Sequence, residues 1–130
     1  MRITDLLDAR SVSLTSSPKT KSEALDQAVA LMTKSGKIND EEAYRSQVYA
    51  REEESTTGIG EGIAIPHGKC DAVSRPGLAA MVIKNGVDFD SLDGEPVTLL
   101  FLIAAPNTKD NVHLDVLSKL SVMLMDEEFT

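Results

Sequence analysis

The segment that most restricts the fold of this chain is residues 97–105, an apolar run in which Thr98 is the one polar residue. Pro106 ends the run, because proline has no backbone N–H to give to a sheet. The run is far shorter than the roughly 20 apolar residues that a membrane-spanning helix needs. A strand that is apolar on both faces belongs in the middle of a sheet whose two faces are covered. Residues 97–104 therefore predict a central strand in a layered protein.

Helical and strand patterns alternate along the rest of the chain. Thr20 to Glu23 has the form of a capping box, and apolar residues at helical spacing follow it until Gly36. A second helix is predicted from Asn39 to about Arg51, with a thin apolar stripe that indicates a surface position. Further strands are predicted at 12–14, 63–65 and 78–83, the last with an Asn85-Gly86 turn signal, and a last helix at 110–129. This alternation predicts an α/β layer arrangement in one domain.

Charge and cysteine content exclude several classes of function. The net charge of −8 sets the protein against nucleic acid and anionic membrane surfaces. The one cysteine, Cys70, cannot form an internal disulfide, which fits a reducing cytoplasm. No apolar stretch follows the charged start, so the sequence predicts no signal peptide. We expect a cytoplasmic protein without nucleic acid as a partner and without direct membrane insertion of this domain.

His67 is the strongest candidate for chemistry. It follows Ile63 to Pro66, at the predicted end of a buried strand, and Gly68 comes directly after it. Pro66 is expected to end the ladder, and Gly68 to let the chain turn and to keep bulk away from the imidazole. The carboxyl ends of strands are where open α/β sheets place their sites. The alternative is a loop histidine without a functional role. The Pro-His-Gly context favours the functional interpretation.

His113 falls in the first turn of the predicted last helix. The free amide hydrogens and the positive dipole end of that turn suit an anion and keep the imidazole neutral. The residues alone support an ordinary surface histidine equally well. Its position after the loop that leaves the central strand can bring it to the same sheet edge as His67, and this favours a shared site.

Arg51 closes the predicted second helix within a run of charged residues. By itself it reads as a solvated side chain among helical charge pairs. A chain of this net charge that holds a dianion nevertheless needs a local cation, and a guanidinium binds phosphate with two parallel hydrogen bonds. Arg51 is therefore the third candidate for the site.

Metal and nucleotide sites are weaker alternatives. His67, Cys70 and His113 are the only histidine and cysteine ligands in the chain, and Lys69 lies between the first two, so we expect no metal. Cys70 is interpreted as a small packing residue rather than a nucleophile. The glycines at 58, 60 and 62 match neither a dinucleotide fingerprint nor a phosphate-binding P-loop. No cofactor is expected.

The sequence resembles a known family over essentially its whole length. Arg51 and the segment 57–68, Thr-Gly-Ile-Gly-Glu-Gly-Ile-Ala-Ile-Pro-His-Gly, are similar to the phosphorylation-site signature of fructose/mannitol-type enzyme IIA domains of the bacterial phosphoenolpyruvate-dependent sugar phosphotransferase system. Further similar segments, closest to fructose-specific members, are 1–7, 86–89, 92–94, 100–106 and 113–120. The resemblance implies a mixed β-sheet flanked by helices on both faces.

The resemblance also implies a mechanism and a set of partners. His67 accepts a phosphoryl group from phospho-HPr and passes it to a cysteine of an enzyme IIB domain, from which it reaches the sugar that enters through IIC. Arg51 and His113 lie beside the phosphohistidine in the family. Phosphoryl transfer asks for a nucleophile, positioning and charge neutralisation, which these residue types supply. The chain would thus act in fructose uptake as a phosphotransferase component, in the cytoplasm or tethered to the membrane through IIB and IIC.

One departure and one alternative accompany the resemblance. Family domains continue as helix beyond the position of Phe129, so residues 1–130 are interpreted as a type-2 IIA domain truncated at its C-terminal helix and forming the N-terminal part of a longer chain. The alternative function is that of a nitrogen-type regulatory IIA module, which acts through phosphorylation-dependent binding of other proteins. The segments 92–94 and 102–106 favour the fructose type.

Overall fold

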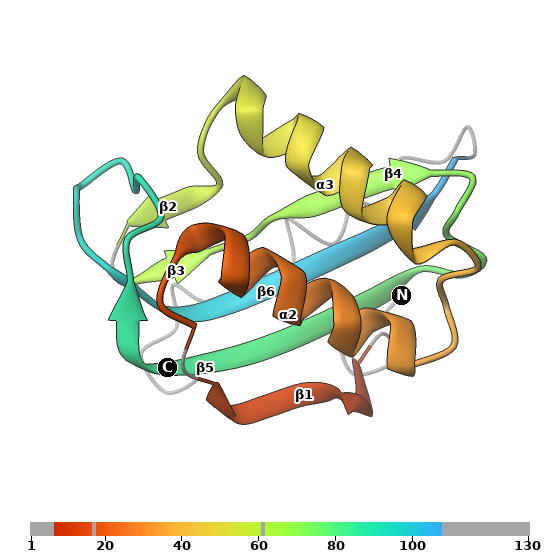
Figure 1. Cartoon of the computed structure of the whole chain (residues 1–130), viewed down its shortest axis with the longest axis horizontal. Coiled ribbons are helices and arrows are strands. Elements are labelled where there is room, and N and C mark those ends of the chain that lie inside the picture. Colours follow the sequence, from red (N-terminus) through yellow and green to blue (C-terminus); the bar gives the residue numbers. More distant parts are fainter. Residues whose placement is uncertain (1–6, 17, 61, 108–130) are drawn as a thin grey trace.

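The computed structural model describes residues 7–16, 18–60 and 62–107, which form a mixed six-stranded sheet with two helices (Figure 1). The helices are α2 (Lys21–Lys34) and α3 (Glu41–Glu54). The strands are β1 (Leu7–Ser16), β2 (Gly58–Gly60), β3 (Ile63–Ala64), β4 (His67–Cys70), β5 (Gly77–Val87) and β6 (Val97–Pro106). The main path across the sheet is β1-β5-β6-β3-β2, and β4 also pairs with β6.

Strand β6 lies at the centre of the sheet, as its apolar run predicts. It pairs antiparallel with β5 on one side and parallel with both β3 and β4 on the other. Leu100, Leu102 and Ala104 belong to the core cluster shared with the helices, while the alternating residues Phe101 and Ile103 are buried on the opposite face. Both faces of β6 are therefore covered.

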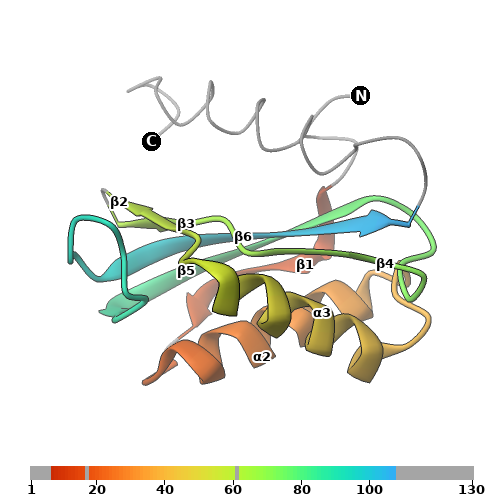
Figure 2. The ribbon, with the colours of Figure 1, turned by 90° about the horizontal axis from the view of Figure 1, so that it is seen from above.

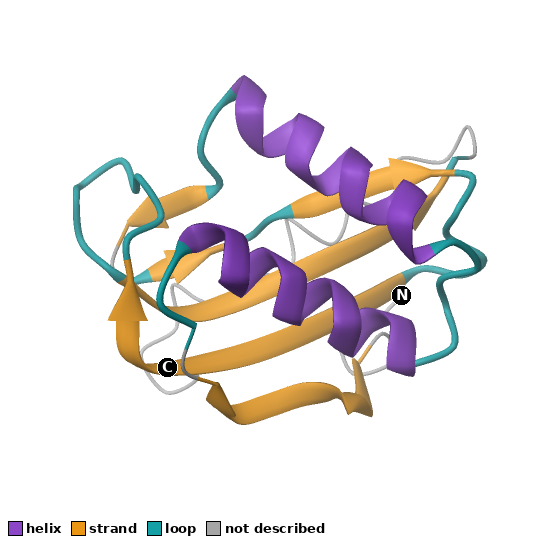
Figure 3. Ribbon diagram, viewed as in Figure 1, coloured by secondary structure: helices purple, strands orange, loops and turns teal. Residues whose placement is uncertain are grey.

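Helices α2 and α3 lie on the same face of the sheet (Figures 2 and 3). The core beneath them contains Tyr44 and Phe89, the largest side chains that are fully buried in the described part of the chain. The mixed sheet and the single layered domain agree with the α/β prediction. The helix predicted at 110–129 lies outside the described residues, so flanking by helices on both faces stays a prediction.

Helix α2 begins as its sequence predicts. Thr20 is the N-cap, and its Oγ1 accepts from the Glu23 N–H at 3.1 Å. The Glu23 carboxylate reaches back one residue further than in the usual capping box and accepts from the Lys19 N–H at 2.6 Å. Gly36, with φ of 80°, follows the C-cap in the left-handed region that glycine tolerates.

Helix α3 differs from its prediction at both ends. Asp40, not Asn39, is the N-cap, and its side chain accepts from the Ala43 N–H. Asn39 instead donates to the Asp71 carbonyl and to Ser74 Oγ, which ties the helix start to the segment after β4. The helix continues past Arg51 to Glu54. Tyr44 and Val48 of its apolar stripe are completely buried. Most of its other residues, Ala43 included, are exposed or half-buried, which agrees with the predicted surface position of the helix.

The Asn85-Gly86 turn signal is also misleading. Both residues lie inside β5, and the pairing of β5 with β6 shifts register between Val82 and Val87. Gly86 has φ of 73°, the conformation that such an irregularity demands. The connection to β6 comes later, at 88–96.

Candidate functional site

His67 begins a strand instead of following the end of one. Strands β3 and β4 run one after the other along the same edge of β6, with Ile65 and Pro66 between them. The Ile103 N–H donates to the Pro66 carbonyl at 3.0 Å, so contact with β6 continues across the gap. Pro66 therefore marks an interruption of the ladder, and His67, opposite Ile103, restarts it.

The imidazole of His67 is half-buried and faces a fixed acceptor. Its Nδ1 lies 3.4 Å from the carbonyl oxygen of Ile65, a long hydrogen bond when that nitrogen carries the proton. In the neutral imidazole one nitrogen is a donor and the other has a lone pair. A proton held at Nδ1 leaves Nε2 as the nucleophilic nitrogen.

Gly68 acts differently from its prediction. It lies in strand β4, and its φ is not in the left-handed region, so it makes no sharp turn. A Cβ at this position would lie 3.0 Å from Tyr44 Cε1 and 3.0 Å from Val48 Cγ2. Glycine is thus required for the close approach of α3 to β4. Tyr44 completes this contact by donating from its hydroxyl to the Ile103 carbonyl at 2.8 Å.

Arg51 lies in the last turn of α3, and the fold carries this turn toward the beginning of β4. The helix runs in the opposite direction to β4 (Figure 1) and packs on Gly68 through its middle residues. The residue is half-buried, and its guanidinium donates from Nη1 to the Ser55 carbonyl at 3.0 Å in an exposed contact. A cation at a helix C-terminus is favoured by the helix dipole, so this contact holds Arg51 at the last turn. His113, the third candidate, lies outside the described residues.

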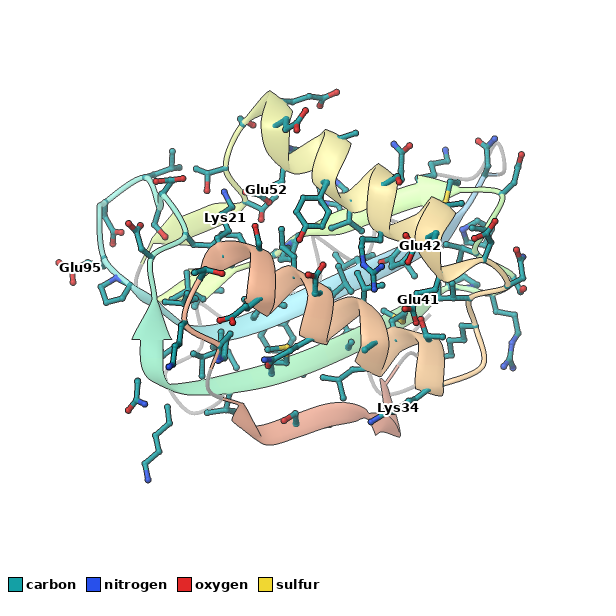
Figure 4. All side chains as sticks on the ribbon, in the orientation of Figure 1. Lys21, Lys34, Glu41, Glu42, Glu52 and Glu95 are labelled. Atoms are coloured by element: carbon teal, nitrogen blue, oxygen red, sulfur yellow. The ribbon has the colours of Figure 1, made fainter. Side chains whose placement is uncertain are left out.

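Glu52 is a buried charged residue that the sequence reasoning missed. Only 8% of it is exposed, although it stands in a run of charged residues. Its carboxylate accepts from the Thr57 N–H at 2.8 Å and the Thr57 hydroxyl at 2.5 Å, and pairs with Lys21 Nζ at 2.9 Å (Figure 4). The sequence does contain a signal for its burial. Glu52 follows Tyr44 and Val48 at four-residue spacing, which puts it on the buried stripe of α3.

The glycine-rich segment before His67 has a packing function. A Cβ on Gly58 would lie 2.4 Å from Ser91 Oγ and 3.0 Å from Ser91 Cα, so glycine at position 58 favours the close approach of the 88–96 connection to β2. The Leu92 N–H donates to the Gly58 carbonyl at 3.1 Å in the same contact. Thr56 adds a bond from its hydroxyl to the Phe89 carbonyl at 2.7 Å. These contacts brace the chain between α3 and β3.

The described residues offer no metal centre or membrane span. No group of three or more His, Cys, Asp or Glu side chains in the described ranges could hold a metal ion. Cys70 is half-buried and packs against the core cluster, as its interpretation as a packing residue predicts. Over the same part of the chain, neither helix is long and apolar enough to cross a bilayer. A groove of about 250 Å³ between α2 and α3, lined in part by Lys21, Tyr49 and Glu52, is smaller than usual ligand pockets.

Comparison with known proteins gives consistent similarities. A sequence model of the family described as "Phosphoenolpyruvate-dependent sugar phosphotransferase system, EIIA 2" matches residues 5–130. The chain is 47% identical over 128 residues to the PTS system fructose-specific EIIABC component of Bacillus subtilis (strain 168), covering 98% of this chain and 20% of that protein. The chain thus spans about a fifth of the length of this relative.

Two solved structures are similar in fold and sequence. The nitrogen regulatory protein IIA-Ntr from Neisseria meningitidis superposes with a TM-score of 0.86 at 29% identity, covering 95% of this chain and 84% of that one. A complex of enzyme IIAMTL and phosphorylated enzyme IIBMTL from Escherichia coli gives a TM-score of 0.81 at 31% identity, covering 94% and 83%. The fold and the sequence thus point to the same group of proteins.

Proposed function

The chain belongs to the EIIA 2 family of the phosphoenolpyruvate-dependent sugar phosphotransferase system, and from this premise we propose that it carries a phosphoryl group on His67. It takes the group from phospho-HPr and passes it to an enzyme IIB domain in the uptake and phosphorylation of fructose. The observation that carries the proposal is the position of the His67 imidazole, whose Nδ1 lies 3.4 Å from the Ile65 carbonyl oxygen. In the tautomer with the proton on Nδ1, Nε2 is the nucleophile.

The first transfer is a displacement at phosphorus. The lone pair of His67 Nε2 forms a new N–P bond as the N–P bond of the donor histidine breaks. The donor imidazole leaves with that electron pair, already protonated on its other nitrogen. The proton on His67 Nδ1 stays in place and faces the Ile65 carbonyl, which stabilises the positive charge that the phosphorylated ring acquires.

The second transfer moves the group to sulfur. A cysteine thiolate of the IIB domain attacks the phosphorus, an S–P bond forms, and the Nε2–P bond breaks with its electrons returning to His67. The Escherichia coli complex supports this partner, because it joins a IIA protein to a phosphorylated IIB protein. The Bacillus subtilis relative is named as an EIIABC component. This name supports a IIB acceptor and a IIC transporter in the same polypeptide as the IIA domain that residues 1–130 of the present sequence form.

Arg51 and His113 are proposed to stabilise the transferring group. The phosphoryl group brings a charge of about −2 to a chain whose net charge is already −8. A guanidinium offers two parallel donors to phosphate oxygens, and a neutral imidazole at a helix N-terminus offers one more. The position of Arg51 in the last turn of α3 supports its part in this proposal.

The proposal is tested by incubating the protein with phosphoenolpyruvate, enzyme I and HPr and measuring its intact mass. We expect the mass of one phosphoryl group, labile to acid and stable to base, in the wild-type protein. The variant His67→Ala is expected to acquire none while keeping its fold by circular dichroism. Labelling of this variant to the wild-type level would refute His67 as the acceptor.

A second candidate function is regulation through phosphorylation-dependent protein binding. It is supported by the TM-score of 0.86 with a nitrogen regulatory IIA protein. The two candidates differ in the second step, because a regulatory module keeps its phosphoryl group when mixed with a fructose-type IIB domain. Transfer to that domain within seconds favours the sugar carrier.

A further inference from the structure

Glu52 holds a buried carboxylate that the transfer chemistry proposed above does not use. The side chain is 5% exposed in its pair with Lys21, whose own side chain is 23% exposed. Removing a carboxylate from water costs several kcal/mol unless hydrogen bonds compensate for the lost hydration. Three donors surround this one: the Thr57 N–H, the Thr57 hydroxyl and the Lys21 ammonium.

The carboxylate fixes the position of Thr57 in two directions. Both its oxygens are used on this residue, one for the backbone N–H and one for the hydroxyl. Thr57 is itself almost fully buried, with 3% exposed. A residue bonded through main chain and side chain to the same rigid helix cannot rotate or slide independently of that helix.

Thr57 in turn is connected to the imidazole through one residue, Ile65, which lies between β3 and β4. The Ile65 N–H donates to the Thr57 carbonyl at 3.0 Å. The carbonyl of the same Ile65 faces His67 Nδ1 at 3.4 Å. A series of hydrogen bonds therefore connects the Glu52 side chain on α3 to His67 Nδ1. A proton held on this nitrogen leaves Nε2 as the nucleophile.

Lys21 connects this network of Glu52, Thr57 and Ile65 to α2. Its ammonium lies 2.9 Å from Glu52 Oε2 and 4.7 Å above the centre of the Phe89 ring, a cation–π distance. Phe89 is fully buried, and its carbonyl accepts the Thr56 hydroxyl. The segment between α3 and β3 is thus held from α2, from α3 and from the 88–96 connection.

We propose that Glu52 is a positioning residue that, through Thr57 and Ile65, holds His67 with its proton on Nδ1 and its Nε2 ready for attack. This inference rests on the proposed function for the identity of the reaction. It assigns to the buried carboxylate an effect on the reacting imidazole in addition to its effect on folding. The effect is one of geometry, since a displacement of about 1 Å in a reacting group can cost on the order of 100-fold in rate.

The test compares two variants that perturb the network with two that do not. Glu52→Gln keeps the shape but removes the charge and one acceptor, and Thr57→Val keeps the shape but removes the hydroxyl. Thr57→Ser restores the hydroxyl. Glu53→Gln makes the same chemical change as Glu52→Gln at the neighbouring exposed position.

The first readout is the ¹⁵N signals of the His67 ring in the unphosphorylated protein, assigned by comparison with His67→Ala. We expect the Nδ1–H tautomer in wild type, in Thr57→Ser and in Glu53→Gln. In Glu52→Gln and Thr57→Val the signals are expected to move toward the mixture of tautomers of an unconstrained imidazole. A merely structural carboxylate would change the melting temperature of these variants and leave their ring signals unchanged.

The second readout is single-turnover phosphorylation by phospho-HPr. Glu52→Gln and Thr57→Val are expected to be slowed on the order of tenfold, with the two controls within about twofold of wild type. Unchanged ring signals in both network variants overturn the inference, and so do wild-type rates in both. If the wild-type protein is not phosphorylated at all, the proposed function fails, while the ring signals still decide the inference. Should Glu52→Gln not fold, Thr57→Val decides alone.

Discussion

Gly68→Ala is expected to destabilise the protein through a collision between β4 and α3. The new Cβ would lie 3.0 Å from a ring carbon of Tyr44 and 3.0 Å from a methyl of Val48. Carbon atoms in contact prefer 3.5–4.0 Å, so each distance is short by about 0.5 Å or more. Neither neighbour can easily move, because both are completely buried and the Tyr44 hydroxyl is bonded to β6.

The expected magnitude follows from two opposing effects. Overpacking a buried site costs about 1–3 kcal/mol. Replacing glycine by alanine at an ordinary φ reduces the entropy of the unfolded chain and returns about 0.4–1 kcal/mol. The midpoints of these two ranges give a net loss of about 1.3 kcal/mol. With an unfolding entropy of about 2.1 cal/mol/K per residue over 130 residues, the melting temperature should fall by about 5 °C.

Thermal melts followed by circular dichroism measure this shift, and a double-mutant cycle identifies its cause. Val48→Ala removes one of the two colliding groups, so Gly68→Ala should cost less in that background, with a coupling of at least about 0.5 kcal/mol. A Gly68→Ala protein that melts at or above the wild-type temperature would refute the packing argument. Additive effects in the cycle would show that the cost does not arise at this contact.

The remaining predictions concern the charged site residues and the buried tyrosine. Arg51→Ala and His113→Ala should each slow single-turnover transfer to a IIB domain on the order of 100-fold while melting within a few degrees of wild type, and rates within threefold for both would leave His67 acting alone. Burial raises the pKa of Tyr44 well above 10.0. Above that pH the unfolded chain loses a phenolic proton that the folded protein retains, so the free energy of unfolding should fall by up to about 1.4 kcal/mol per pH unit. Urea titrations at about pH 9 and about pH 11 measure this fall in the free energy of unfolding, which should be smaller in Tyr44→Phe than in wild type. Tyr49 ionises in both proteins, so its contribution is common to the two.

Features that depend on neighbours in sequence could be predicted from the chain alone. The central strand is such a case, because an apolar run fixes burial on both faces without reference to its partners. The start of α2 is another, since Thr20 and Glu23 bond to amides within the same turn. The same locality makes the Pro66-His67 segment recognisable as a candidate site, which stays a prediction.

Predictions are wrong where a feature depends on partners that are remote in sequence. Asn39 could cap a helix as well as Asp40 does, but its side chain bonds to the Asp71 carbonyl, far along the chain. Gly68 was expected to turn the backbone, whereas the reason for a glycine lies in Tyr44 and Val48, the side chains of another element. Local propensity describes which conformations a residue can adopt, and tertiary packing determines which of them it adopts.

Glu52 shows why the site needs both kinds of information. Helical spacing from Tyr44 and Val48 places residue 52 against the sheet, and this much the sequence contains. A buried carboxylate in that place would oppose folding unless donors met it, and those donors come from Lys21 on another helix and from Thr57 beyond the helix end. The donors on Thr57 belong to the segment that leads to Ile65 and His67. The hydrogen bonds that compensate for burial of the Glu52 charge are therefore the same bonds that fix the position of the imidazole. A hydrophobic residue at position 52 could fill the space, but it could not hold Thr57 by two hydrogen bonds.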